Sequence, residues 1–153
     1  MTEAQPFRYY LRVRYGECDQ QGVVYNARYG DYVDLACTEF LNTALGRASV
    51  SGGGFEVQVV KLLIEWTASA RYDDGLEISV TLNKLGMTSF TLGFEMRKVG
   101  STAVIVTAET VNVHIEPKGW TKTPLPEAIR AKLTEAARGQ FVDHAGVFTP
   151  TLA

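Results

Sequence analysis

The chain opens with alternating apolar and polar residues. From Phe7 to Tyr15 the odd positions are apolar or aromatic, whereas three of the even positions are arginines. A period of two places successive side chains on opposite faces of a strand, so this segment is predicted to form a half-buried strand. The sequence GECDQQGVVYN comes next, and its Gly16, Asp19 and Gly22 are typical of turns.

A helical period replaces this alternation from Ala27 to about Leu45. At about 100° per residue, polar side chains fall on one side of a helix and apolar side chains form a broad arc on the other. The arc contains Tyr29, Tyr32, Val33, Ala36, Cys37, Phe40 and Leu41. Asn26 is predicted to be the N-cap, and Gly46 is predicted to end the helix. The pattern therefore indicates one long amphipathic helix.

Strand-like runs follow a glycine-rich stretch, residues 46–54, which predicts a flexible loop. Apolar and polar residues then alternate in four runs, at residues 60–67, 76–83, 90–97 and 103–115. The last run changes phase near Ala108, which predicts a bulge or burial of both faces. Short connections that contain glycine predict antiparallel hairpins between the runs. Residues 126–138 predict a short helix, whereas the tail, residues 139–153, has no clear period.

The order of elements predicts an α+β fold. A helix with so broad an apolar arc needs a partner, and a curved antiparallel sheet of about five strands wrapped around it would bury that arc. We expect one domain over residues 1–153, with its core at about 7–138 and a C-terminal tail. The free edges and the outer face of such a sheet invite a second copy of the chain.

Composition and charge argue against several classes of function. The chain has 153 residues, a formal net charge of −2 and 46% hydrophobic residues, which suits a globular domain. The slightly acidic balance argues against a nucleic-acid partner, which would require a basic surface. The sequence contains no recognisable secretory signal, no apolar run long enough to span a membrane, and too few cysteines for a disulfide scaffold. We therefore expect a soluble, cytoplasmic protein without a membrane partner.

The segment RYGECDQQGVVYNARYGDYVD, at residues 14–34, resembles the 4-hydroxybenzoyl-CoA thioesterase-like family of hotdog proteins. In that family a strand ends in an acidic residue, a Gly-Val/Ile-Val-Tyr segment follows, and the central helix then begins. Here Asp19, the run Gly22 to Tyr25 and Asn26 occupy those places. Residues 71–96 are similar to the second-to-fourth strand region of the family. The resemblance implies a hotdog fold, an acyl-CoA or acyl-carrier thioester as substrate, and a homodimer or homotetramer with the site between subunits.

The resemblance also implies roles for single residues. Asp19 matches the catalytic carboxylate, which acts as a general base on water or as a nucleophile. At Asn26, a backbone N–H is implied to polarise the thioester carbonyl. Asp34 matches an acidic residue that the family commonly has fifteen positions after the catalytic one. Tyr25, Tyr29 and Val33 are the candidate substrate-binding residues, and a core position is the alternative for those on the apolar arc.

Thioester hydrolysis needs few protein groups. A base or nucleophile must face the carbonyl carbon, and hydrogen-bond donors must face the developing oxyanion. A helix start supplies free N–H groups and a partial positive charge, and the thiolate leaves readily. The reaction therefore requires no metal and no cofactor, with coenzyme A present only as part of the substrate. Simpler roles compete with these: Asp19 as a turn residue, Asn26 as a helix cap and Asp34 as a solvated acid.

The remaining polar residues give weaker signals. Cys18 and Cys37 are more typical of small buried apolar positions than of a catalytic Cys–His pair. His114 shares its strand phase with polar neighbours, which favours a surface or interface position. No Lys-Ser/Thr follows the glycines at 52–54, so they are interpreted as a flap or a linker. Five cations are candidate partners of the coenzyme A phosphates, and no pattern selects among them: Lys84, Arg97, Lys98, Lys118 and Lys122.

Two other function classes compete with hydrolysis. Hotdog hydratases and dehydratases use a histidine in the first half of the domain, and here no histidine precedes His114. A hotdog dimer that binds an acyl ligand or a protein without turnover remains possible, since a sequence motif does not prove catalysis. An acyl-CoA thioesterase that depends on Asp19 is the leading hypothesis.

Overall fold

The computed structural model describes residues 4–51 and 54–148. Within them, seven strands form one sheet in the order β2-β5-β4-β3-β1-β7, and β6 pairs with β5 outside this path. The helices are α1 (Arg28–Leu45), α2 (Arg47–Ser51) and α3 (Glu127–Glu135), and a short 3-10 helix spans Tyr15–Glu17. The strands are β1 (Phe7–Arg12), β2 (Val57–Trp66), β3 (Gly75–Leu85), β4 (Ser89–Lys98), β5 (Val104–Glu116), β6 (Thr121–Lys122) and β7 (Phe141–Asp143).

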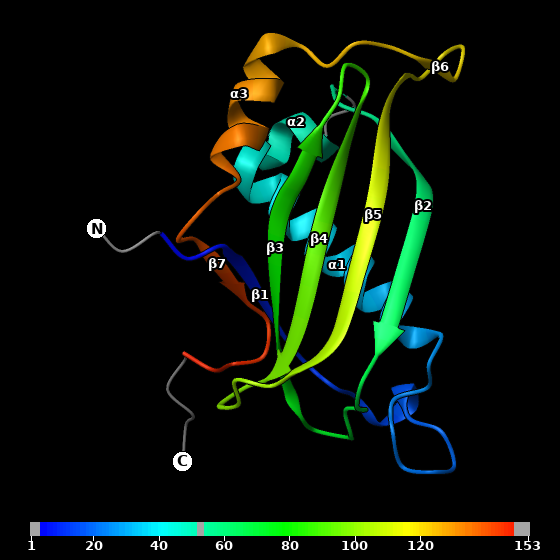
Figure 1. Ribbon diagram of the computed structural model, residues 1–153, viewed down its shortest axis with the longest axis vertical. Coiled ribbons are helices and arrows are strands. Elements are labelled where there is room, and N and C mark those ends of the chain that lie inside the picture. The colour runs from blue at the N-terminus through cyan, green and yellow to red at the C-terminus, as the bar shows by residue number, and fades with distance from the viewer. Residues whose placement is uncertain (1–3, 52–53, 149–153) are drawn as a thin grey trace.

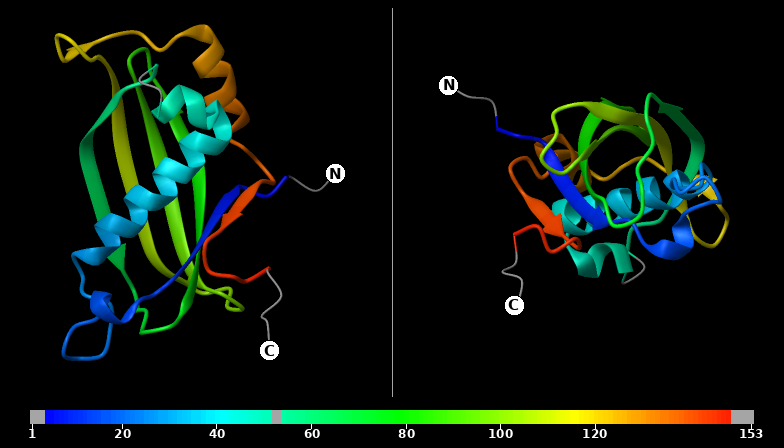
Figure 2. Two further views of the ribbon diagram at one scale, coloured as in Figure 1. Left: turned by 180° about the vertical axis from the view of Figure 1, so that it is seen from behind. Right: turned by 90° about the horizontal axis from the view of Figure 1, so that it is seen from below.

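Helix α1 lies diagonally across one face of the curved sheet (Figures 1 and 2). Neighbouring strands are antiparallel except β1 and β7, which run parallel. The register shifts within the β2–β5, β3–β4 and β4–β5 pairs, and such irregularities let a sheet bend around a helix. The sheet can therefore cover the broad apolar arc of α1.

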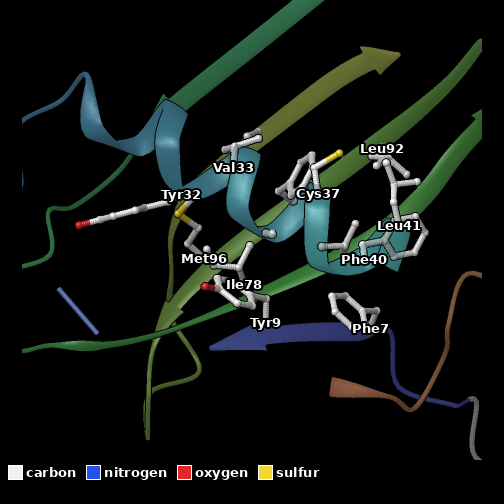
Figure 3. Packing of buried hydrophobic residues seen from close by; sticks show 14 of the residues in the cluster. Phe7, Tyr9, Tyr32, Val33, Cys37, Phe40, Leu41, Ile78, Leu92 and Met96 are labelled. Atoms are coloured by element: carbon white, nitrogen blue, oxygen red, sulfur yellow. The ribbon is translucent and has the colours of Figure 1, made fainter. Parts of the chain in front are cut away.

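The core forms between that arc and the inward-facing side chains of the sheet (Figure 3). Phe7 of β1 and Phe40 of α1 are fully buried and meet edge to face, with ring centroids 5.8 Å apart. Ile78 and Met96, from two neighbouring strands, are also fully buried in this cluster. The periods of α1, β1, β3 and β4 therefore predicted the apolar faces correctly, because these faces are buried against one another. The alternation in β2 did not, because most of its residues are exposed.

The predicted number of about five strands is wrong. The two additional strands, β6 and β7, contain two and three residues, which is too short to show a period of two. β7 lies in the C-terminal tail, for which no structure was expected, and it pairs with β1. The edge of the sheet at β1 is thus covered by a distant segment of the chain. The hairpin predicted between residues 60–67 and 76–83 is also wrong, because β2 pairs with β5 and only β3–β4 and β4–β5 form hairpins among the five long strands.

Three local predictions also need correction. The first strand ends at Arg12 rather than Tyr15, since the chain turns into the 3-10 helix. Residues 47–51 form α2 instead of a flexible loop, because Gly46, at φ 90°, reverses the chain after α1. The N-cap of α1 is Ala27 rather than Asn26, and no side chain caps the helix. Two of the glycines interpreted as a flap, at 52 and 53, lie outside the described residues.

The sheet has one open edge and one covered edge. β2 has no neighbour on its outer side in the described chain, and most of its residues are exposed. Val60, Leu62 and Trp66 are 62%, 49% and 45% exposed, although strands normally bury such side chains. No helix among the described residues is both long and apolar enough to cross a membrane.

Candidate active site

Asp19 lies in a narrow hairpin between the 3-10 helix and α1. Cys18 and Val24 form an isolated bridge, and the Asp19 N–H donates to the Val23 carbonyl at 2.9 Å. The Gly22 N–H donates back to the Asp19 carbonyl at 3.0 Å, and Gly22 has a φ of 77° that suits glycine. The hairpin is the blue loop that extends beyond the start of α1 in Figure 1.

The carboxylate of Asp19 is partly buried and only partly engaged. Its Oδ1 accepts the backbone N–H of Gln21 at 2.8 Å, which is the bond that a turn-forming aspartate makes. No other group of the described chain donates to this carboxylate. Asp19 is therefore oriented by the turn while its second oxygen stays available.

Backbone donors are open at the start of α1. The N–H groups of Arg28 and Tyr29 already donate to the carbonyls of Tyr25 and Asn26, at 2.8 and 3.4 Å. The N–H groups of Asn26 and Ala27 have no backbone acceptor within the described residues. Such groups at a helix start can bind a carbonyl oxygen that gains negative charge.

The hairpin and the helix start are fixed to the same segment between β2 and β3. The Val24 N–H donates to the Ala70 carbonyl at 2.9 Å, and the Ala70 N–H donates to the Tyr29 hydroxyl at 3.0 Å. Val23 forms a second isolated bridge with Arg71. These bonds join Asp19 and the free N–H groups of α1 in one small rigid unit.

Glu17 is a buried acid next to this unit, and it is 7% exposed. Its Oε1 accepts the Tyr32 hydroxyl at 3.0 Å and the Arg14 backbone N–H at 2.7 Å. Its Oε2 accepts the Arg14 guanidinium at 3.1 Å. Burial raises the pKa of Glu17, but the hydrogen bonds from Arg14 and Tyr32 outweigh burial and leave that pKa below its ordinary value.

The lowered pKa of Glu17 predicts a pH-dependent stability. The ionised Glu17 carboxylate adds to the free energy of unfolding. This contribution is fully present above the ordinary pKa of 4.5 and is lost as the pH falls through the lower pKa of the folded state. The Tm difference between wild type and Glu17→Gln should therefore be largest near neutral pH and shrink at acid pH. Thermal melts at several pH values measure this difference, and a constant gap would contradict it. Glu17 lines a hollow together with five other titratable or charged residues: Tyr9, Arg12, Arg14, Tyr32 and His144.

Comparison with known proteins identifies the family. A model described as the thioesterase-like superfamily matches residues 13–133. The chain belongs to this superfamily. It is 31% identical over 131 residues to the acyl-CoA thioester hydrolase YbgC of Escherichia coli O6:H1, covering 84% of this chain and 96% of that protein.

Solved structures of thioesterases share the fold of this superfamily member. Slr0204, a 1,4-dihydroxy-2-naphthoyl-CoA thioesterase from Synechocystis, matches with a TM-score of 0.75 and 24% identity, covering 84% of this chain and 96% of that one. A mutant 4-hydroxybenzoyl CoA thioesterase complexed with 4-hydroxybenzoyl CoA matches with a TM-score of 0.75 and 19% identity, covering 85% and 99%. The predicted α+β hotdog-like fold is therefore confirmed, with seven strands in place of about five.

The other predicted site residues of this thioesterase-like chain lie in different environments. Asp34 is exposed on α1, as is Tyr25 just before the helix. Tyr29 and Val33 are 1% and 2% exposed, so both are core residues in the isolated chain. Tyr29 packs edge to face against Trp66 of β2, with centroids 5.9 Å apart, which places the helix start beside the open edge.

The prediction of a buried cysteine agrees with the structure for Cys37, whereas Cys18 is only partly buried. The histidine prediction does not agree with the structure. Burial, with a smaller effect of Asp34, raises the pKa of the Cys37 thiol to about 12, which suits a buried apolar position. His114 is buried rather than at the surface, since it stacks on Phe55 with centroids 5.0 Å apart. Its Nδ1 lies 3.2 Å from two backbone carbonyl oxygens. Within the described chain, no three His, Cys, Asp or Glu side chains gather closely enough to hold a metal ion.

The five candidate cations separate into two groups. Arg97 and Lys98 pair with Glu95 and Asp74, at 2.9 and 3.5 Å. The other three form no ion pair within the described residues and occupy the opposite end of the sheet, near the β3–β4 turn and β6 (Figure 1): Lys84, Lys118 and Lys122.

Glu17 is the residue of this region that sequence reasoning missed. A lone acid two positions before Asp19 has no periodic signal, and its partner Tyr32 fits the apolar arc of a helix. Figure 3 shows the Tyr32 hydroxyl pointing away from the other labelled core side chains. Only the fold shows that it donates to Glu17 of the 3-10 helix.

Proposed function

We propose that this chain hydrolyses acyl-CoA thioesters, with Asp19 as the carboxylate that drives the reaction. The N–H groups of Asn26 and Ala27 donate hydrogen bonds to the carbonyl oxygen of the thioester. The observation that carries the proposal is the joint fixation of Asp19 and these donors to the Ala70 segment. Membership of the thioesterase-like superfamily and the similarity to YbgC support the same reaction class.

Two routes use the same groups. In one, Asp19 removes a proton from water as that water attacks the carbonyl carbon. In the other, an Asp19 oxygen attacks the carbon and forms an anhydride, which water then hydrolyses. In both routes the C–S bond breaks, coenzyme A leaves as a thiolate that takes up a proton, and the acyl group becomes a carboxylic acid. The free N–H groups at the start of α1 stabilise the oxyanion intermediate in both routes.

We further propose a homodimer formed through β2. Apolar side chains are exposed along this edge strand, while β7 covers the edge at β1. A two-fold axis would pair two copies of β2 antiparallel and continue the sheet. The contact of Tyr29 with Trp66 places the helix start at one end of this strand, so each site would border the second subunit.

In such a dimer, the lysines that form no ion pair would bind the phosphates of coenzyme A. Antiparallel pairing brings the β6 end of one subunit beside the Asp19 hairpin of the other. There Lys118 and Lys122 flank Trp120, which is 65% exposed and held at a φ of 53° in its turn. An exposed aromatic ring between two cations suits an adenine nucleotide. Lys84 lies at the same end of the sheet (Figure 1).

Hydrolysis assays with a panel of acyl-CoA thioesters test the proposal. We expect release of free coenzyme A from at least one aliphatic or aromatic member, followed with a thiol reagent. The panel should include acyl-carrier-protein thioesters, because the nucleotide and the carrier protein present different surfaces. Binding without turnover of any of these thioesters would instead support a non-catalytic acyl-binding module.

A further inference from the structure

We propose that Glu17 is a positioning residue that holds Asp19 at a set distance from the start of α1. The inference rests on the proposed function, since it concerns how the Asp19 carboxylate is placed. The Glu17 carboxylate bonds to Arg14 and Tyr32 and makes no hydrogen bond to Asp19 or to the free N–H groups. It acts through the hairpin that follows it.

Glu17 connects three segments that are separate in the fold. Its backbone N–H donates to the Arg14 carbonyl at 3.0 Å, which closes the 3-10 helix after β1. Its carbonyl accepts the Tyr25 N–H at 2.9 Å, so Glu17 and Tyr25 form the base of the hairpin that carries Asp19. Its carboxylate accepts the hydroxyl of Tyr32, which belongs to the second turn of α1.

These bonds determine where Asp19 can lie. The hairpin is attached at one end to Glu17, and Asp19 follows only two residues later. The Tyr32 bond fastens that attachment directly to α1, and the open donors of Asn26 and Ala27 immediately precede the first turn of this helix. A displacement of about 1 Å between reacting groups can cost about a hundredfold in rate, so a direct tie between base and helix matters for turnover.

Hydrogen bonds, rather than close packing, orient the Glu17 carboxylate. A hollow of about 250 Å³ lies beside it, lined in part by Leu35 and His144. Side-chain packing is therefore incomplete on that side. A buried carboxylate is costly unless it is paired, and Arg14 and Tyr32 provide its donors. The two bonds from Arg14 hold the carboxylate within the 3-10 helix segment, and the bond from Tyr32 ties that segment to α1.

The test compares Glu17→Gln and Tyr32→Phe with wild type in steady-state acyl-CoA hydrolysis. Both variants nearly keep the size of the side chain. Tyr32→Phe removes the hydrogen bond to Glu17, whereas Glu17→Gln weakens it, because a neutral amide oxygen accepts more weakly than a carboxylate and the amide NH2 cannot accept from Arg14. We expect kcat to fall at least about tenfold in each, while KM changes by less than about threefold, because the substrate contacts remain. The double variant should lose no more kcat than the less active single variant, since both changes act on the same hydrogen bond.

Glu39→Gln is the matched control. Glu39 is also a buried acid with an arginine partner, Arg47 at 3.2 Å, but it lies near the other end of α1. Its variant should keep the wild-type kcat even if its Tm falls as much as that of Glu17→Gln. Equal losses of kcat in the two glutamate variants would overturn the positioning role and indicate general destabilisation. Tyr32→Phe decides the question if Glu17→Gln does not fold.

A cycle with Asp19→Asn separates this inference from the proposed function. If Glu17 acts through Asp19, Glu17→Gln should lower kcat in the wild-type background and have no further effect in Asp19→Asn. A loss in Asp19→Asn with full activity in both Glu17→Gln and Tyr32→Phe would overturn the positioning role alone. Full activity in Asp19→Asn would overturn the proposed role of Asp19 in hydrolysis, and the positioning role of Glu17 would fall with it.

Discussion

Asp19→Asn should lower kcat at least about a hundredfold on any acyl-CoA that the wild type hydrolyses. Asparagine can still accept the Gln21 N–H through its amide oxygen, so the turn should survive. The amide can neither take a proton from water nor attack the carbonyl as a carboxylate does. KM should change little, because the free N–H groups of α1 and the rest of the binding surface are unaltered.

The control for this experiment is Asp31→Asn. Asp31 lies in the first turn of α1, is exposed and pairs with Arg28 at 3.3 Å, so the substitution removes the same charge close by. It should leave kcat within about twofold of wild type, since exposed pairs contribute little. Equal activity of Asp19→Asn and wild type would exclude Asp19 from the mechanism.

Leu62→Glu should convert a dimer into monomers and reduce kcat/KM by at least about a hundredfold. Leu62 is half exposed on the open edge strand, next to Gly30 of α1. A charge there would be buried without a partner in a continuous two-subunit sheet, and that costs several kcal/mol. Activity should fall with assembly because the helix start borders this edge. Light scattering and hydrolysis rates on the same sample measure both effects.

Val99→Glu provides the comparison for the edge substitution. Val99 is another exposed apolar residue, but it lies in the turn between β4 and β5, away from β2. That variant should keep the wild-type mass and rate. A wild-type protein that is monomeric at assay concentration and fully active would contradict the proposed assembly. A dimeric and fully active Leu62→Glu variant would place the interface elsewhere.

The positions of the main elements were predictable because their signals are local. The helical period over residues 27–45 and the alternations of β1, β3 and β4 reflect which face each element buries, and the structure keeps these faces. In β2 the predicted apolar face is mostly exposed. Gly46 ends α1 as expected, since its positive φ is easily adopted by glycine. The ends of the elements were less predictable. Asn26 suits an N-cap, yet Ala27 holds that position and no side chain caps the helix.

The resemblance of residues 14–34 to a known family singled out Asp19, but its surroundings depend on distant residues. Ala70 supplies the carbonyl and the N–H that fasten the hairpin and Tyr29, and nothing in the local pattern marks it. The prediction for His114 failed for a related reason. Its strand phase suggested a polar face, but Phe55 folds over it and buries the ring.

The sequence by itself determined the order of the strands and the central helix, the apolar faces that form the core, and the motif that belongs to a thioesterase-like chain. Periodicity and turn residues encode these features within short windows. Tertiary structure alone decided that β7 covers one edge while β2 stays open, that Glu17 is tied to Tyr32, and that Tyr29 is buried. Each of these depends on contacts between segments far apart in the chain, whose free energy is gained only once the sheet has closed around α1.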